Sequence, residues 1–214
     1  MKAAIDVFPS LIVGAKLTLL LTALSVAIGT AIGLFMGLFK MSANPLLRGF
    51  SIAYIDFFRG TPLLVQIFLW YFGILPLIFG TVDPFFAGVV ACSVNCGAYT
   101  AEIVRAGIQS IDKGQMEAAM SLGLNYRQAM QYIILPQAFK VMIPPLINEF
   151  IAIMKDTCLV SAIAVEELFR KGQLYVATSW QPFWIYTEVA IMYLILYLVI
   201  ANLGAYIERR LQTS

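Results

Sequence analysis

The chain has 214 residues, of which 61% are hydrophobic and 12% charged, and its formal net charge is +2. A soluble domain keeps about a quarter of its residues charged, so this composition excludes an ordinary soluble domain and indicates an integral membrane protein. The sequence has no histidine and no G-x-x-x-x-G-K-[ST] loop, which argues against histidine-ligated metals or haem, Ser-His-Asp catalysis and nucleotide binding on this chain.

Five segments are long and apolar enough to cross a bilayer, which requires about 20 residues per helix. They cover residues 11–39, 62–79, 85–109, 141–165 and 183–207. We therefore expect an all-α integral membrane protein with five transmembrane helices in one domain, residues 1–214. The first segment is too long for a signal-peptide core and no clear cleavage site follows it, so we interpret it as a retained helix.

Positive charges in the connecting loops predict the orientation. Nine Lys or Arg residues lie in the 1–2 connection, the 3–4 connection and the C-terminal end, against three on the opposite side. Lys and Arg concentrate in cytoplasmic loops. The C-terminus is therefore expected in the cytoplasm and the N-terminus outside, in a multi-pass protein of the cell (inner) membrane that contacts lipid.

The first two spans carry packing and capping signals. In the first span small residues recur at four-residue spacing, at Ser25, Gly29, Gly33 and Gly37. This spacing lets another helix approach closely, within the chain or from another chain. The second span is expected to begin at Thr61 as N-cap, followed by Pro62, and residues 51–58 are expected to form a short interfacial helix before it.

The half-polar segment between the third and fourth spans, residues 110–138, is predicted to form two short helices. Asp112 begins the first, with Gln115 at capping-box spacing, and Gly123 can end it with a positive φ. Asn125 with Gln128 begins the second helix, and Pro136 ends it.

The turn between these two helices carries little side-chain bulk, because Ala118 and Ala119 lie shortly before Gly123. Such a surface lets another protein approach closely. The alternative is an interfacial helix pair that only rests on lipid headgroups, with Met116 and Met120 facing the lipid.

Charged side chains inside a bilayer need a partner or a wet cavity. In the third span an amide, a phenol and a carboxylate share one helix face, at Asn95, Tyr99 and Glu102. In the fourth span two carboxylates seven residues apart share a face, at Glu149 and Asp156. We predict that these five residues bind substrate. The alternative for Glu102 is a pair with Arg105 on its own helix, and for Asp156 a structural pair with Lys155 or another helix.

Four stretches resemble the membrane-spanning subunits of ABC importers. The spacing of Glu117-Ala118-Ala119, Gly123, Ile133 and Leu135-Pro136 matches the EAA signature of these proteins without a gap. The stretches "FRGTPLLVQ" (58–66) and "AYTAEIVRAGIQSIDKGQ" (98–115) resemble the branch of polar amino-acid permeases of the histidine, glutamine and arginine type. "KDTCLVS" (155–161) resembles it too, although the family usually has Ser at position 158.

This resemblance implies a type I ABC-importer permease fold, in which the two short helices of the cytoplasmic loop couple the permease to a separate ATPase. The residues expected at that interface are Glu117, Ala118, Ala119, Gly123, Asn125 and Arg127. The implied partners are cytoplasmic ABC ATPase subunits, which hold ATP and Mg, a second permease copy or a paralogue, and an external substrate-binding protein. We expect no cofactor, metal or nucleic acid on this chain.

The expected function is that of a permease subunit for polar amino acids, with no covalent chemistry of its own. Three carboxylates (Glu102, Glu149 and Asp156) opposed by Lys155 would leave the cavity net negative by two, which favours a basic amino acid. Glutamine or another polar neutral amino acid is the alternative. An autonomous ion-coupled carrier or channel is the alternative of a different class, but it leaves the capped insert unexplained. The outer segment 166–181 is expected either to meet the binding protein or to form an ordinary gate loop.

Overall fold

The structure, a computed structural model, describes residues 2–212, and this part of the chain is helical without strands. The α-helices are α1 (Lys2–Lys40), α2 (Pro45–Gly60), α3 (Leu63–Phe68), α4 (Leu75–Phe79), α5 (Pro84–Gln109), α6 (Lys113–Ser121), α7 (Tyr126–Ala129), α8 (Leu135–Asp156), α9 (Leu168–Ser179) and α10 (Pro182–Gln212). Two π-helical segments, η1 (Leu69–Ile74) and η2 (Met130–Ile134), and a 3-10 helix, η3 (Thr157–Ile163), join them.

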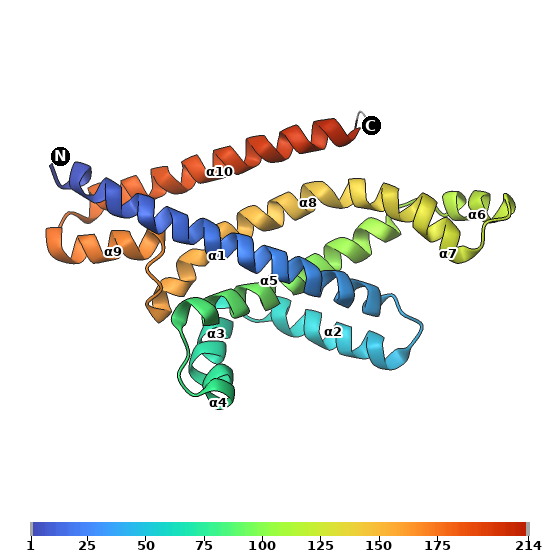
Figure 1. Cartoon of the computed structure of the whole chain (residues 1–214), viewed down its shortest axis with the longest axis horizontal. Coiled ribbons are helices and arrows are strands. Elements are labelled where there is room, and N and C mark those ends of the chain that lie inside the picture. The colour runs from blue at the N-terminus through green and yellow to red at the C-terminus, as the bar shows by residue number, and fades with distance from the viewer. Residues whose placement is uncertain (1, 213–214) are drawn as a thin grey trace.

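The long helices run roughly along one direction of the molecule (Figure 1). The short helices α6 and α7 form one end, and α9 lies at the other end, near the N-terminus. Within the described residues, three helices are long and apolar enough to span a membrane, Val7–Lys40, Pro84–Gln109 and Pro182–Leu211, and a bent pair can form a fourth span. α8 has a comparable length, but its prolines and its amide and charged side chains make it more polar than these three.

The second span differs from the prediction. α2 begins at Pro45 and packs in the bundle, where the hydroxyl of buried Ser51 donates to the carbonyl oxygen of Met36 in α1 (2.6 Å). The helix expected at 51–58 is part of a longer helix that contacts α1, and its expected place at the membrane interface stays a prediction. The span is broken after α2, with a bend of 108° between Pro45–Gly60 and Leu63–Phe79. Thr61 is the C-cap of α2, not the N-cap of the next helix, because Pro62 drives the preceding residue into extended geometry (φ −120°, ψ 148°).

The row of small residues in α1 packs against α5 of the same chain. A Cβ at Gly29 would lie 2.7 Å from the Cβ of Cys96, and a Cβ at Gly33 would lie 2.5 Å from the Cβ of Thr100. At Gly37 it would lie 2.9 Å from the carbonyl oxygen of Ala101. The close approach of α1 and α5 therefore depends on the missing side chains.

We expect Gly33→Leu to destabilise the protein, because the new side chain would force α1 away from Thr100. Overpacking of this kind costs about 1–3 kcal/mol or more. Gly49→Leu in α2 is the matched control, since a Cβ there meets nothing within 4 Å. Thermal unfolding in detergent measures the difference; equal midpoints for the two variants would contradict the packing argument.

The two short helices of the 110–138 segment begin as predicted. Asp112 caps α6 by accepting from the N–H of Gly114, although Gln115 does not close a capping box. Asn125 and Gln128 do form a capping box at the start of α7. Gly123 has φ +88°, as expected for the turn between the helices.

The prediction that Pro136 ends the second helix is wrong, because the chain continues through η2 into α8. The N–H of Leu135 donates to the carbonyl of Met130, five residues back. Leu75, which also precedes a proline, makes the same kind of bond to Trp70 at the end of η1. A proline has no N–H and its ring clashes with the carbonyl four residues earlier. One wider π turn before each proline accommodates that clash and lets the helix go on.

Candidate functional site

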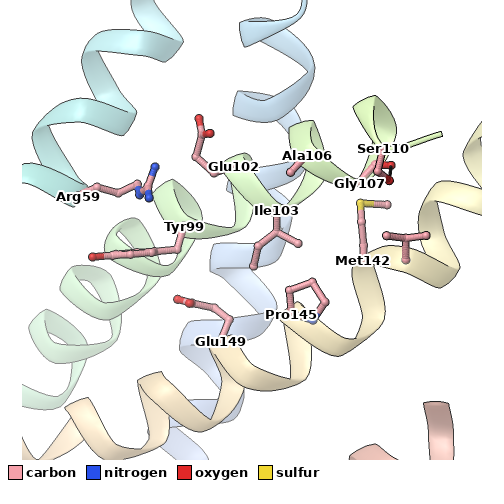
Figure 2. A pocket seen from close by; sticks show the side chains of 11 residues that line it. Arg59, Tyr99, Glu102, Ile103, Ala106, Gly107, Ser110, Met142, Pro145 and Glu149 are labelled. Carbon is pink, nitrogen blue, oxygen red and sulfur yellow. Dashed lines mark hydrogen bonds between the residues drawn. The ribbon is translucent and has the colours of Figure 1, made fainter. Parts of the chain in front are cut away.

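A cavity of about 410 Å³ lies between α5, α8 and the end of α2 (Figure 2). This volume is within the range of small-molecule sites in proteins. It is mostly apolar, with a few polar side chains. The lining residues are Arg59, Tyr99, Glu102, Ile103, Ala106, Gly107, Ser110, Val141, Met142, Pro145 and Glu149.

Arg59 enters the cavity from the last turn of α2, just before the break at Thr61 and Pro62. Its guanidinium carbon lies 5.2 Å from the centre of the Tyr99 ring, which is cation–π geometry. The sequence analysis missed this residue and counted it among the loop charges. The signal that could have found it is its place directly before Gly60-Thr61-Pro62, because a break in a span often brings a polar side chain to a binding site.

Glu149 reaches the cavity from α8, on the wall below Tyr99 (Figure 2). Pro145, one turn earlier in α8, lines the same wall. Since Pro145 has no N–H, the carbonyl oxygen of Val141 lacks its helical donor and is left as a further acceptor. Among the described residues no ion pair joins Glu149 to Arg59. A guanidinium and a carboxyl group thus face one cavity without an ion pair between them.

Glu102 also lines the cavity, but its charge is compensated. It pairs with Lys40 at the end of α1 and with Arg105 on its own helix, where the N–O distance is 2.8 Å. Its carboxylate points away from Glu149 (Figure 2). The alternative foreseen for Glu102, a pair with Arg105, is therefore present. The expectation of three uncompensated carboxylates against one lysine is wrong.

The remaining predicted substrate residues lie outside this lining. Asn95 is 5% exposed, and its amide donates to Phe58 and Gln66. Asp156 is the last residue of α8, half-buried and outside the cavity wall. Lys155 lines grooves between α8 and α10 instead. The structure therefore brings Tyr99, Glu102 and Glu149 together, and separates Asn95 and Asp156 from them.

The segment 166–181 has a clear structural role in the fold, which the sequence did not indicate. Glu167 is fully buried and caps α9, where it accepts from the N–H groups of Phe169 (2.8 Å) and Arg170 (2.7 Å). The hydroxyl of Tyr193 in α10 also donates to it (2.9 Å). Glu166 and Lys171 pair on the surface at 2.5 Å. Glu167 thus joins α9 to α10 and is not available to a partner.

At the opposite end, α6 and α7 present a compact protruding surface. The N–H of Gly123 donates to Met120 (3.0 Å) and the N–H of Leu124 to Ala119 (3.2 Å), which together make a Schellman turn. Of the predicted interface residues, Ala119 is buried, while the exposed ones are Glu117, Ala118, Gly123, Asn125 and Arg127.

Two large side chains at this turn were missed by the sequence analysis. Leu122 is 82% exposed and Tyr126 is 62% exposed. For Leu122 the signal that could have found it is an apolar residue directly before a helix-ending glycine, and within the described residues its side chain stays largely uncovered.

The helix arrangement, with its broken second span and projecting helix pair, defines the class of protein. A solved structure of an amino acid ABC transporter with histidines matches it with a TM-score of 0.91 and 42% identity, covering 96% of each chain. The expected type I ABC-importer permease fold is thereby confirmed. Residues 29–213 match the family described as "binding-protein-dependent transport system inner membrane component", and the chain belongs to this family.

Relatives within the family are amino-acid permeases. The chain is 46% identical to the L-cystine transport system permease protein TcyB of Bacillus subtilis (strain 168), over 78% of this chain and 71% of the relative. It is 41% identical to the glutamine transport system permease protein GlnP of Escherichia coli (strain K12), over 95% of this chain and 94% of the relative. These relatives carry different amino acids, so the family alone does not define the substrate.

Proposed function

We propose that the chain is the translocating subunit of an ABC importer that carries polar amino acids, and basic ones preferentially, across the cell membrane. It works as a pair, with a second copy or a paralogue, above two ATPase subunits that bind ATP and Mg. An external binding protein delivers the amino acid. The observation that carries the proposal is the cavity in which Arg59 and Glu149 face one space without an ion pair between them.

This arrangement suits the two charges that every free amino acid carries. Arg59 can hold the α-carboxylate with two parallel N–H···O bonds. Glu149 and the carbonyl oxygen of Val141 can accept from the α-ammonium group. In each case a group of the protein would replace the water around one charged end of the amino acid. Because the cavity is mostly apolar, these hydrogen bonds would be stronger than in bulk solvent.

The side-chain preference follows from the carboxylates that remain. Asp156 lies seven residues after Glu149 on the same face of α8, about 10 Å along the helix. Among the described residues it has no ion-pair partner. A bound arginine or lysine that extends along α8 toward Asp156 would meet this carboxylate. Glutamine, which needs only hydrogen bonds, is the second choice.

The helix pair α6–α7 is proposed as the coupling element. Its projecting turn, with exposed Leu122 and Tyr126 beside Ala118 and Gly123, offers an apolar contact with little bulk around it. It continues through η2 directly into α8, which carries Glu149. Movement of an ATPase beneath this turn would therefore act on a wall of the cavity. In this proposal α6, α7 and the C-terminus lie in the cytoplasm and the N-terminus lies outside.

The test is reconstitution of the chain in proteoliposomes with its ATPase subunit and binding protein. We expect ATP hydrolysis to be stimulated most by L-arginine or L-lysine, less by L-glutamine and not by L-glutamate. Saturable uptake by the purified chain alone, without ATP, would favour the ion-coupled carrier and contradict the proposal.

A further inference from the structure

Two buried amide side chains hold the break between α2 and α3. The amide nitrogen of Gln66 donates to the carbonyl oxygens of Phe58 (2.9 Å) and Thr61 (3.0 Å) and to the hydroxyl of Thr61 (2.9 Å). The amide nitrogen of Asn95 donates to the same carbonyl of Phe58 (3.1 Å) and to the amide oxygen of Gln66 (3.0 Å). Gln66 is 1% exposed and Asn95 5% exposed.

These bonds replace helical bonds that the sequence cannot make. The α-helical donor for the carbonyl of Phe58 would be the N–H of residue 62, which is a proline. The carbonyl of Phe57 would need the N–H of Thr61, whose backbone is extended, and accepts from the Thr61 hydroxyl instead (2.8 Å). Unpaired carbonyls are costly inside a bilayer. The amides of Gln66 and Asn95 therefore stabilise the break itself.

The same network controls the position of Arg59. Arg59 directly follows Phe58, so the bonds to the Phe58 carbonyl fix the backbone from which the arginine side chain projects. Asn95 and Tyr99 lie one turn apart on α5. Asn95 donates to the carbonyl oxygen of Phe58, the residue before Arg59. The Tyr99 ring lies beneath the guanidinium of Arg59. The hydroxyl of Tyr54 donates to the carbonyl of Val94 (2.5 Å) and anchors the preceding turn of α2 on α5.

We propose that Gln66 and Asn95 are positioning residues for substrate binding, which orient Arg59 in the cavity without touching the amino acid. The inference rests on the proposed function, in which Arg59 binds the α-carboxylate. Asn95, predicted from the sequence as a substrate ligand, thus acts through Arg59. Because the α-carboxylate is common to all amino acids, loss of this pair affects every substrate alike and leaves side-chain selectivity unchanged.

The test uses Gln66→Met and Asn95→Leu, which keep the approximate size of each side chain and remove its donor. Equilibrium dialysis of the purified permease–ATPase complex gives the Kd for L-arginine and for L-glutamine. We expect each variant to raise both Kd values about 3- to 10-fold, which is the effect of one hydrogen bond. The ATPase rate at saturating amino acid should remain near that of the wild type. Ser51→Ala is the matched control, since it removes a buried bond of α2 to α1, away from Arg59.

A double-mutant cycle separates positioning from general loss of stability. Arg59→Lys keeps the positive charge but loses the planar guanidinium group, which can make two parallel hydrogen bonds to a carboxylate. In that background Gln66→Met should raise Kd by less than 2-fold, whereas in a Glu149→Gln background it should retain its full effect. Equal effects in both backgrounds, or wild-type Kd values in both single variants, would overturn the positioning role alone. Absence of saturable binding to the wild-type complex would overturn the proposed function and this inference with it.

Discussion

Gly123→Asp is expected to uncouple ATP hydrolysis from transport while the chain still inserts into the membrane. Gly123 has φ +88°, a conformation that costs a residue with a side chain about 1–2 kcal/mol. Both bonds of the Schellman turn, from the N–H groups of Gly123 and Leu124, depend on this geometry. The aspartate would distort the turn and add a charge beside the exposed Leu122. We expect the amino acid transported per ATP hydrolysed to fall at least tenfold, or the ATPase to dissociate on purification.

Gly123→Asn is the matched control for this variant. Asparagine has nearly the same size as aspartate, carries no charge and tolerates a positive φ better than most residues. It should therefore retain more of the coupling than Gly123→Asp. Transport and hydrolysis measured in the same proteoliposomes check the prediction. If Gly123→Asp transports as much amino acid per ATP hydrolysed as the wild type, this turn is not the ATPase contact.

The features of the helix pair that the sequence predicted are those that depend on neighbouring residues only. A helix start at Asn125 with Gln128 and a glycine with positive φ need no information from elsewhere in the chain, although the capping-box spacing of Asp112 and Gln115 did not produce a capping box. The close packing of α1 was predicted for the same reason, because small residues at a four-residue spacing lie on one face whatever that face meets. Its partner, α5, was not predictable, since it depends on how the helices are arranged.

The predictions that failed involve prolines and charges, whose effects depend on tertiary surroundings. Pro136 was expected to end a helix, but the chain makes one π turn before this proline and continues into α8. Pro62 breaks the second span, and the break is stable because Asn95 and Gln66 replace the missing donor. The periodicity of α5 correctly placed Asn95, Tyr99 and Glu102 on one face. It could not show that Asn95 and Glu102 already have partners in other helices.

Arg59 illustrates the same limit for the candidate site. A charge count assigns it to a loop, because the sequence does not reveal that the chain turns by 108° at the next residues. Arg59 lies in the last turn before that bend and lines the cavity together with Glu149. In the proposed site it would bind the α-carboxylate, so the charges would match the two ends of an amino acid, whereas the sequence suggested an excess of negative charge.

Glu149→Gln and Asp156→Asn are expected to affect transport in different ways. In the proposed site Glu149 binds the α-ammonium group, which all amino acids share, so Glu149→Gln should weaken binding of arginine and glutamine alike. Asp156 would meet only a basic side chain, so Asp156→Asn should weaken arginine and spare glutamine. A hydrogen bond to a charged group is worth about 1.5–3 kcal/mol, which corresponds to a roughly 10- to 100-fold change in Kd.

Glu102→Gln is the matched control for both variants, because the carboxylate of Glu102 is already paired with Lys40 and Arg105 and points away from Glu149. It should lower thermal stability without changing the Kd for arginine or for glutamine. Uptake and Kd for L-arginine, L-glutamine and L-glutamate in the three variants provide the comparison. If Asp156→Asn weakens arginine and glutamine equally, or if the wild type prefers glutamate, the basic preference is wrong. If Glu102→Gln raises the Kd values for arginine and glutamine as much as Glu149→Gln does, the assignment of the α-ammonium group to Glu149 is wrong as well.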